Sequence, residues 1–559
     1  LSSDEQTAVS YSGGWIDAGA YSHPSLHNFT YEDNTIDWMK VLGEGCVKAN
    51  EVITSNVDDK YKTPARAMRA YFEFIMMDCW GDAPIIDPTV EGIDIRDRQP
   101  RADVARYIEK ELLDIIPRIS TEVGGENYGK PNKYMAQALL AKLYINWAVY
   151  TAASVDQYDA ATAVNEKLDA CISVCDELIN SGKFNLGSMP YRFKFGPNNS
   201  ALNVEDFIYA MPYDTYTAQG MQYGRANSYK DIKSLSPSYY GMKLSNSGGA
   251  YMTMTPEFAN LFSLPGDERN NCVIGGQVYV YDPTTLLPTS QLAKDRAGNP
   301  LVLTKSITLR YTDAAHTTLD WKNLDVGDNL EGWRQGYRSV KFFVIDDDYK
   351  NGRNQSNDLP IFRYADILLT KAEALVRKST AGATAQALFN QIRAYVHAPL
   401  LTHVPTLQDI YEERGREFMN ENWRRNDMIR FGHFEDEFFP HYRSNPNANF
   451  EKPRASSDTS HLPALLQDAQ PEHFLEAEPR LSATVSITAG PCLRPLSANL
   501  PRGWPFSFVF FAGPAGHRSL PQSLRRRGVP TTCNFILPLS REPRQVSNVT
   551  NNRKEHHEI

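Results

Sequence analysis

The chain has 559 residues, of which 42% are hydrophobic and 22% charged, and its formal net charge is −9. This composition is typical of a globular protein with one large domain or roughly two to three average ones. No apolar run reaches the about eighteen residues that a membrane-spanning helix needs, so the sequence predicts no transmembrane helix.

The start of the chain and its cysteines carry little functional signal. The sequence begins at Leu1 with neither an initiator Met nor a signal-like segment, so we expect its natural start and its targeting information to lie upstream. The seven Cys show none of the clustering of a zinc site, and we expect neither a metal nor a cofactor. Cys171 and Cys175 lie one helical turn apart on an apolar face, where packed core thiols are expected.

Amphipathic helices dominate the N-terminal part of the chain. Apolar residues recur every three or four positions in 63–84, 132–152 and 160–184, and the last of these stretches runs into Ser-Gly, a signal for a helix C-terminus. The same pattern returns in 358–378 and 387–396. Small residues recur where such helices would cross. The sequence therefore predicts a mainly α fold with tetratricopeptide-type helix pairs.

The composition changes between residues 187 and 358, where Gly, Asn, Ser, Pro and Tyr become common. Short strand-like runs appear there, such as 275–282 and 339–346. We predict that this loop-rich insert (187–358) is carried by a helical frame of residues 35–186 and 359–435. Loops on a rigid frame are a usual place for a binding site, so the insert is the predicted ligand-binding part.

The stretch YEERGREFMNENWRRNDMIRFG (411–432) is dense in charge but neutral, because five Arg balance four Glu and one Asp. A phosphate-binding helix needs surplus positive charge, so we expect no nucleic-acid site here. Steps of three and four residues predict that the charges lie along one side of a helix and pair successively. These charges are Glu417, Glu421, Arg424, Asp427 and Arg430. An ion-paired carboxylate keeps a low pKa and is a poor general acid, which favours a structural helix over a catalytic one.

The same stretch resembles the signature of the SusD/RagB family, outer-membrane nutrient-binding lipoproteins of Bacteroidetes. The signature is E-R-x-x-E-x-x-x-E-x-x-R-x-x-D-x-x-R-x-G. The matching residues are Glu413, Arg414, Glu417, Glu421, Arg424, Asp427, Arg430 and Gly432.

Four other segments resemble the same family in the same order. Residues 361–375 are similar to R-Y-A-E-x-L-L-x-x-A-E-A, with Asp366 in place of the Glu. Residues 66–84 are similar to R-A-x-x-Y-x-x-L-x-x-x-F/W-G-D-x-P, and short stretches within residues 2–30 resemble the family's segment before its first long helices. The resemblance covers about residues 1–450 and implies a SusD-like helical fold for them.

The C-terminus departs from the family pattern, I-F-P-x-P followed by N-P-N-x-x-x-N-P-G-Y. Residues 461–481 are HLPALLQDAQPEHFLEAEPRL instead. Shifted by one base, degenerate codons for them can spell Ile-Phe-Pro and then Asn-Pro-Asn-Ile-Ser-Trp-Lys-Gln-Asn-Pro-Gly-Tyr. We therefore expect a frameshift between about Glu451 and His461, so that 451–481 is an out-of-frame version of the family ending.

The last 78 residues, 482–559, differ from the rest in composition. They carry nine Arg and one Lys against three Glu and no Asp, together with nine Pro and no helical or strand periodicity. We predict that they are a non-native, disordered read-through tail rather than a nucleic-acid-binding segment.

The resemblance implies a non-catalytic, surface-exposed glycan-binding subunit of a nutrient importer. Its partner would be a SusC-like TonB-dependent outer-membrane transporter, with no nucleic acid as partner. Its place would be the outward face of the outer membrane, held by a lipid anchor on a Cys upstream of Leu1. The residues agree in showing no P-loop, G-x-S-x-G, H-E-x-x-H or compact Cys/His set.

Sugar sites combine aromatic faces with amides, carboxylates and Arg that hydrogen-bond to hydroxyls. The 29 Tyr and 8 Trp supply many such rings, although ordinary packing is the alternative for each. The residues that we predict to bind the sugar are Trp15, Asp17, Tyr21, Tyr223, Asn227, Tyr240, Tyr251 and Trp333. In contrast, Trp80, Trp147 and Trp423 lie in helical motifs and are predicted to be core.

Two other hypotheses remain open from the sequence. A helical-repeat scaffold for peptide uptake or protein binding would explain the helices but not the aromatic loops. An all-α glycoside hydrolase would need two unpaired carboxylates about 5–10 Å apart across a cleft, which the sequence does not exclude.

Overall fold

The computed structural model describes residues 2–14, 22–27, 38–153, 157–202, 204–230, 232, 236–320, 324–434 and 436. The chain divides into two units, and every described residue lies in the larger one, Leu1–Arg480 with Asn499–Phe511. The predicted out-of-frame segment and tail lie outside the described residues. Of the helices in the described ranges, none is both long enough and apolar enough to cross a membrane.

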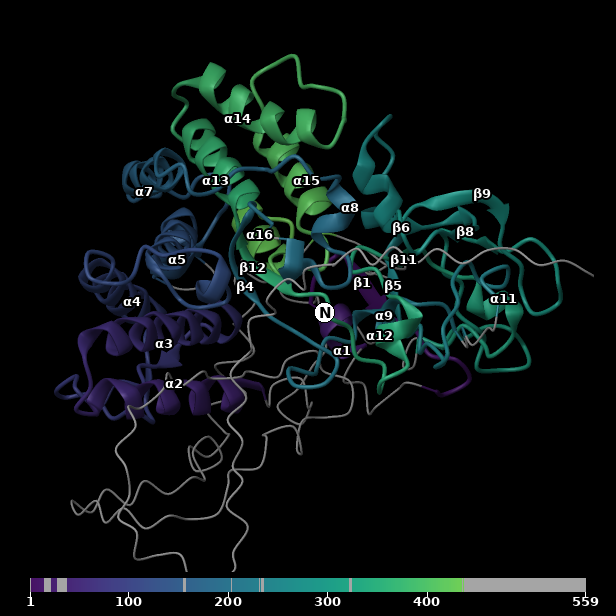
Figure 1. The fold of residues 1–559 in the computed structure, drawn as a ribbon, viewed down its shortest axis with the longest axis horizontal. Helices are drawn as coiled ribbons and strands as arrows, with labels where there is room; N and C mark the ends of the chain where they lie inside the picture. The colour runs from purple at the N-terminus through teal and green to yellow at the C-terminus, as the bar shows by residue number, and fades with distance from the viewer. Residues whose placement is uncertain are drawn as a thin grey trace, which may run out of the picture. The chain divides into compact units, whose positions relative to one another are not determined.

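Successive helices of the frame pack against one another (Figure 1). They are α2 Trp38–Thr54, α3 Asp59–Trp80, α4 Arg101–Ile115, α5 Lys133–Ile145, α6 Trp147–Thr151, α7 Leu168–Asn180, α13 Tyr364–Arg377, α14 Gly382–Tyr395, α15 Leu407–Glu417 and α16 Arg424–Phe431. The long helices contact one another in chain order, α2 with α3, α3 with α4, α4 with α5 and α5 with α7. Helix α7 also packs on α13, which follows the insert in sequence. The predicted mainly α fold is confirmed.

Local sequence signals fix the ends of these helices. Asp58 caps α3 by accepting a hydrogen bond from the Lys60 N–H, and α3 ends at Gly81, whose φ of 81° is readily adopted by glycine. Asn132 caps α5 in the same way. Every residue of α5 after Lys133 is buried, because this helix lies inside the row rather than at its surface.

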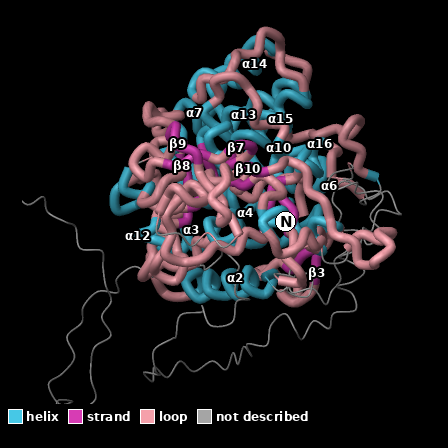
Figure 2. The backbone as a smooth tube through the Cα atoms, turned by 90° about the vertical axis from the view of Figure 1, so that its right-hand side faces the viewer, coloured by secondary structure: helices cyan, strands magenta, loops and turns pink. Residues whose placement is uncertain are grey.

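The insert consists of short elements joined by loops (Figure 2). Its helices are α8 Tyr191–Lys194, α9 Tyr223–Asn227, α10 Pro256–Ala259, α11 Leu330–Trp333 and α12 Asp346–Tyr349. Its strands are β4 Phe207–Met211, β5 Met252–Met254, β6 Val273–Ile274, β7 Gly276–Gln277, β8 Tyr279–Tyr281, β9 Pro288–Leu292, β10 Val302–Leu303 and β11 Arg338–Ser339. The elements outside the insert are β1 Gln6–Ala8, α1 His23–Leu26, β2 Ala83–Pro84, β3 Arg98–Gln99 and β12 Leu359–Arg363.

The described strands form antiparallel pairs, and two of these pairs join the insert to other parts of the chain. Strand β12, which leads into α13, pairs with β4 of the insert. The N-terminal strand β1 pairs with β5. Within the insert, β6 pairs with β11, β7 with β10 and β8 with β9, while β2 and β3 pair beside the helices.

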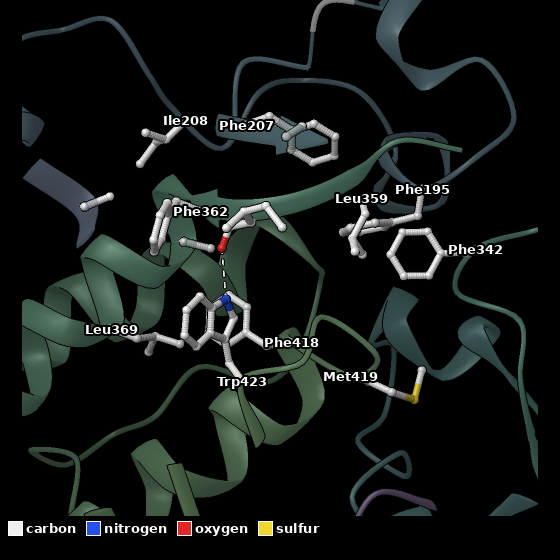
Figure 3. Close-up of a cluster of buried hydrophobic side chains, with 14 of the residues drawn as sticks. Phe195, Phe207, Ile208, Phe342, Leu359, Phe362, Leu369, Phe418, Met419 and Trp423 are labelled. Atoms are coloured by element: carbon white, nitrogen blue, oxygen red, sulfur yellow. Dashed lines mark hydrogen bonds between the residues drawn. The ribbon is translucent and has the colours of Figure 1, made fainter. Parts of the chain in front are cut away.

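One hydrophobic core runs from the helices into the insert, and Figure 3 shows the part around Trp423. The Trp423 indole N–H donates to the Ile361 carbonyl at 2.9 Å, and its ring stacks on Phe362 at 5.6 Å. Trp80 and Trp147 are buried as well, so the prediction that these three Trp are core is confirmed. Cys171 and Cys175 are free and fully buried, as predicted for packed thiols.

Candidate functional site

The charged stretch forms two helices, which corrects the prediction of a single one. Helix α15 ends at Glu417 and α16 begins at Arg424. In the turn between them Asn420 and Asn422 adopt left-handed conformations, with φ of 61° and 67°. Asn tolerates this conformation better than most residues, which explains how the chain reverses without glycine.

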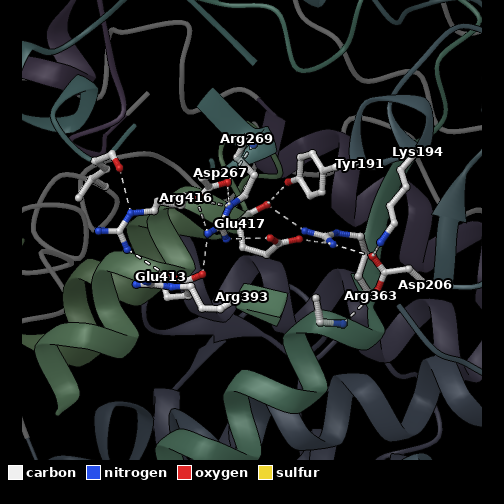
Figure 4. A network of polar contacts seen from close by, with 12 residues as sticks. Tyr191, Lys194, Asp206, Asp267, Arg269, Arg363, Arg393, Glu413, Arg416 and Glu417 are labelled. Carbon is white, nitrogen blue, oxygen red and sulfur yellow. Dashed lines mark hydrogen bonds and ion pairs between the residues drawn. The ribbon is translucent and has the colours of Figure 1, made fainter. Parts of the chain in front are cut away.

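Most partners of the charges lie on other segments rather than along the same helix (Figure 4). Glu413 binds Arg269 at 2.7 Å and Arg393 at 2.6 Å. Glu417 binds Arg269 at 3.0 Å and Arg363 at 2.8 Å. Arg269 belongs to the insert and Arg363 ends β12, so α15 joins the insert to the frame.

Arg363 is the centre of this network. Its guanidinium contacts Glu417 and Asp206 from Nη1, at 2.8 and 2.7 Å, and Glu421 from Nε at 2.8 Å. Asp206 also binds Lys194 at 2.9 Å. Although burial opposes it, the two neighbouring cations lower the pKa of Asp206 to about 2.

A second group of ion pairs holds α16. Asp427 binds Arg414 at 2.9 Å and Arg430 at 2.6 Å, and only the second of these pairs follows the predicted spacing within one helix. Arg430 also binds Glu373 of α13 at 2.8 Å. Arg424 binds Asp4 from the N-terminal segment through both carboxylate oxygens, each at 2.7 Å.

These contacts support the structural interpretation of the signature. Its charged residues are all buried, and each is ion-paired. Burial raises the pKa of Glu413 and Asp427, but their Arg neighbours outweigh that effect and hold both values below the ordinary range. Such carboxylates stay ionised and cannot supply the proton that a glycosidase needs.

Three of the predicted sugar-binding residues, Trp15, Asp17 and Tyr21, lie outside the described residues. The structure does define the point from which their segment starts. Ser10 pairs with Asp325, and Tyr11 and Gly14 form a turn. The purple N-terminal turn accordingly lies beside the teal loops near α11 in Figure 1.

Two predicted residues of α9 occupy the junction between the insert and the N-terminal strand. The Tyr223 ring packs on Phe342, with ring centroids 5.1 Å apart, and its hydroxyl donates to the exposed Asn422 at 3.4 Å. Asn227 is buried, accepts a hydrogen bond from the Gln6 amide and donates to the Tyr223 carbonyl. In this structure both side chains serve packing between segments.

The other predicted residues of the insert are also buried. Tyr240 stacks on Tyr229 at 5.5 Å, and Tyr251 packs on Ala8. The Trp333 indole N–H donates to Asp328 at 2.8 Å, and the Arg296 guanidinium covers its ring at 4.8 Å. The structure therefore does not bring these rings together on one exposed surface.

Tyr311 is an exposed ring of the insert that the sequence analysis did not select, and 47% of it is exposed. It begins a hairpin in which it pairs with Leu319, and Asp313 closes the tip by accepting from the Thr317 and Thr318 N–H groups. The His316 ring stacks on Tyr311 at 4.9 Å and 11°, which leaves the opposite ring face as the one available to a ligand.

The loop beside this hairpin is held by Asp325. Its carboxylate accepts from the Ser12 N–H at 3.0 Å and the Gly327 N–H at 2.7 Å, and its carbonyl accepts from the Arg310 N–H. The half-exposed Arg310 guanidinium donates to the Ser12 hydroxyl at 3.1 Å. These contacts join residues 10–14, 310–320 and 324–328 into one region. Its exposed side, which carries Tyr311 and Arg310, is here named the Tyr311 surface. The buried Trp333 contacts this region through its hydrogen bond to Asp328.

The sequence did contain a signal for two exposed tyrosines of the insert, Tyr279 and Tyr216. In 277–281, buried Val278 and Val280 flank Tyr279, so alternation directs Tyr279 outward. Tyr216 follows Asp214, which accepts three backbone hydrogen bonds in a tight turn, and is 76% exposed. Rings in turns and on outward strand positions are better candidates than rings in apolar runs.

The fold and this surface define a class: a helical-repeat protein with a loop-rich insert that displays exposed aromatic rings. Residues 205–461 match the SusD family. The starch-binding protein SusD of Bacteroides thetaiotaomicron is 33% identical over 110 residues, and the match spans about a fifth of each chain, 19% of both. The predicted resemblance to the SusD family is thereby confirmed over the matched residues.

Solved structures share the fold at low sequence identity. A SusD homologue from Bacteroides thetaiotaomicron has a TM-score of 0.56 and 17% identity, covering 82% of this chain and 86% of that one. A laminarin-binding SusD-like protein has a TM-score of 0.54 and 18% identity, covering 78% and 85%. Surface glycan-binding protein A of Bacteroides thetaiotaomicron, solved with laminarihexaose, has a TM-score of 0.53 and 20% identity, covering 79% and 86%.

Proposed function

We propose that this protein is a non-catalytic glycan-binding protein that captures an oligo- or polysaccharide. The observation that carries the proposal is the SusD-family match of residues 205–461, which includes the exposed tyrosines of the insert. Relatives of the same fold include proteins named for binding starch, laminarin and surface glycans.

The Tyr311 surface is the proposed binding site. An exposed aromatic face can stack on the C–H face of a sugar, and Arg310 can donate to its hydroxyls. Trp15, Asp17 and Tyr21 stay in the proposal, because their segment starts at Gly14, next to Asp325 and Arg310. The five predicted residues that the structure describes have supporting roles in the revised proposal: Tyr223, which is partly buried, and Asn227, Tyr240, Tyr251 and Trp333, which are buried.

Affinity gel electrophoresis against plant, host and microbial polysaccharides, including starch and laminarin, tests this function. We expect retardation by at least one glycan. Tyr311→Ala should weaken that binding by about fivefold or more, since an aromatic anchor is typically worth more than about 1 kcal/mol. Trp15→Ala should weaken it as well.

Tyr61→Ala is the matched control for Tyr311→Ala. Tyr61 is exposed to 41%, close to the value for Tyr311, but lies on α3 of the helical frame. It should leave retardation unchanged. A folded protein that no glycan retards would refute the proposal and favour peptide cargo or a protein scaffold. Release of reducing sugar from a bound polysaccharide would favour the hydrolase instead.

We further propose that the protein acts at the outer membrane with a SusC-like TonB-dependent transporter, held there by an N-terminal lipid. The match of residues 205–461 to the SusD family supports this. Protease treatment of intact cells that make the natural full-length protein should degrade it, whereas a periplasmic marker should survive. Co-purification of a TonB-dependent barrel from detergent extracts would identify the partner.

The proposed frameshift is supported by the extent of the family match, which ends at residue 461. That residue begins the stretch whose second reading frame can spell the family ending. Sequencing the gene should reveal codons that spell Ile-Phe-Pro and Asn-Pro-Gly-Tyr one base out of frame. Codons that cannot spell these residues would refute the frameshift.

A further inference from the structure

A second exposed surface lies on the small sheet around β8, here named the Tyr279 face. Tyr279 and Leu292 are direct partners of the β8–β9 pair, so their side chains lie on the same side of it. Val302 is the partner of Gln277, which is two residues from Tyr279 and therefore on that side as well. These three apolar side chains are 37–42% exposed.

The opposite side of the same strands is packed. Val278, Ala293 and Leu301 are each at most 2% exposed and form part of the core. Their backbones are joined in a ring, since Val278 donates to Leu301, Leu301 to Ala293 and Ala293 to Val278. The core therefore fixes the positions from which Tyr279, Leu292 and Val302 project.

Polar groups lie beside this face. The Gln277 side-chain amide donates to the Val278 and Leu301 carbonyls, each at 3.0 Å. No described residue donates to the Gln277 side-chain carbonyl, which stays able to accept from a hydroxyl. Tyr239, 41% exposed, adjoins through its pairing with Lys294.

The size and chemistry of the face select its ligand. A stable protein interface needs roughly 20–30 residues from each partner and about 1,000 Å² or more, which four exposed apolar side chains do not supply. A ring flanked by aliphatic side chains and a fixed amide matches what one or two sugar rings offer, namely a C–H face and hydroxyls.

We propose that the Tyr279 face is a second sugar-binding platform, distinct from the Tyr311 surface, and that the natural ligand is a polysaccharide long enough to touch both. Tyr311 follows Val302 by nine positions, so at most about 30 Å of chain joins the two surfaces. This inference rests on the proposed glycan-binding function. It narrows the proposed ligand from an oligo- or polysaccharide to a long polysaccharide.

Ligand length distinguishes the two platforms. Calorimetry should measure the affinity of each protein for the polysaccharide that retards the wild type and for a tetrasaccharide cut from it. Tyr311→Ala should lower the affinity for both ligands. Tyr279→Ala should lower the affinity for the polysaccharide about threefold to tenfold and leave that for the tetrasaccharide unchanged. Leu292→Gln should have the same effect as Tyr279→Ala, and Tyr61→Ala should change neither affinity.

Three results would overturn the inference. If Tyr279→Ala and Leu292→Gln bind the polysaccharide like the wild type, the platform is refuted while the glycan-binding function stands. If the wild type binds no glycan, the proposed function fails and the platform with it. If the wild type elutes as an oligomer in size-exclusion chromatography and Tyr279→Ala converts it to a monomer, the face is an interface between copies.

Discussion

Arg363→Ala is expected to destabilise the protein by about 3–5 kcal/mol, the range typical of breaking a buried ion pair. The Arg363 side chain is 1% exposed and contacts three buried carboxylates, those of Asp206, Glu417 and Glu421. Its removal leaves their charges inside the protein with fewer cations. Urea unfolding followed by circular dichroism, with the free energy of unfolding compared between variant and wild type, measures the effect.

Two further variants serve as controls for Arg363→Ala, namely Arg363→Lys and Arg96→Ala. Arg363→Lys keeps the charge but loses the fork of donors that reaches three acceptors, so an intermediate loss is expected. Arg96 pairs with Asp94 at the surface, where its side chain is 62% exposed, and Arg96→Ala should leave the free energy of unfolding nearly unchanged. An Arg363→Ala protein as stable as the wild type would show that the network contributes nothing net.

Glu73→Gln is expected to remove much of the loss of stability that the wild type shows as the pH rises from about 5 to about 8. Glu73 of α3 is fully buried and accepts a hydrogen bond from the Ile86 N–H at 2.8 Å. Burial raises its pKa to about 8, although Arg69 opposes the shift. Gln is a neutral isostere of the protonated acid, so it keeps the shape without titrating.

The sign follows from proton binding in the two states. Between about pH 4.5, where the unfolded carboxyl titrates, and pH 8, folded Glu73 holds a proton that the unfolded chain has released. Its stabilising contribution is thus fully present below pH 4.5 and is lost by about 1.4 kcal/mol per pH unit up to pH 8. Relative to wild type, Glu73→Gln should gain roughly 3–5 kcal/mol between pH 5 and pH 9.

Comparing Glu73→Gln with the wild type cancels the effect on stability of every other group that titrates in both proteins. Burial also raises the pKa of Glu5 to about 7 and that of Asp358 to about 6, but both proteins share these groups. Unfolding free energies at pH 5, 7 and 9 are the measurement, with exposed Glu51→Gln as the control that should follow the wild type. Parallel curves for Glu73→Gln and wild type would show that Glu73 is ionised when folded.

The sequence predicted the frame better than the site. Helical periodicity and caps such as Asp58 and Asn132 are local, so helices in these regions could be predicted without the fold. The turn at Asn420 and Asn422 was missed, because charge spacing continues through it and neither residue is a Gly or Pro. A run of helix-spaced charges does not show where the backbone reverses.

Exposure of the aromatic residues was the main failure. Tyr240, Tyr251 and Trp333 lie in loop-rich sequence, yet all three are buried under other segments. Their burial depends on contacts distant in sequence, such as Val9 with Tyr251. Tyr311 and Tyr279 are exposed because a hairpin and a strand pairing direct them outward.

The sequence by itself determined the mainly α class, the family signature and the balance of charge within it. Those properties depend on residue type and on spacing along the chain, which local physics translates directly. Only the tertiary structure decided that Glu417 pairs with Arg269 and Arg363, and which tyrosines face outward. Ion pairing and burial depend on distances between segments far apart in sequence, and only the folded chain sets those distances.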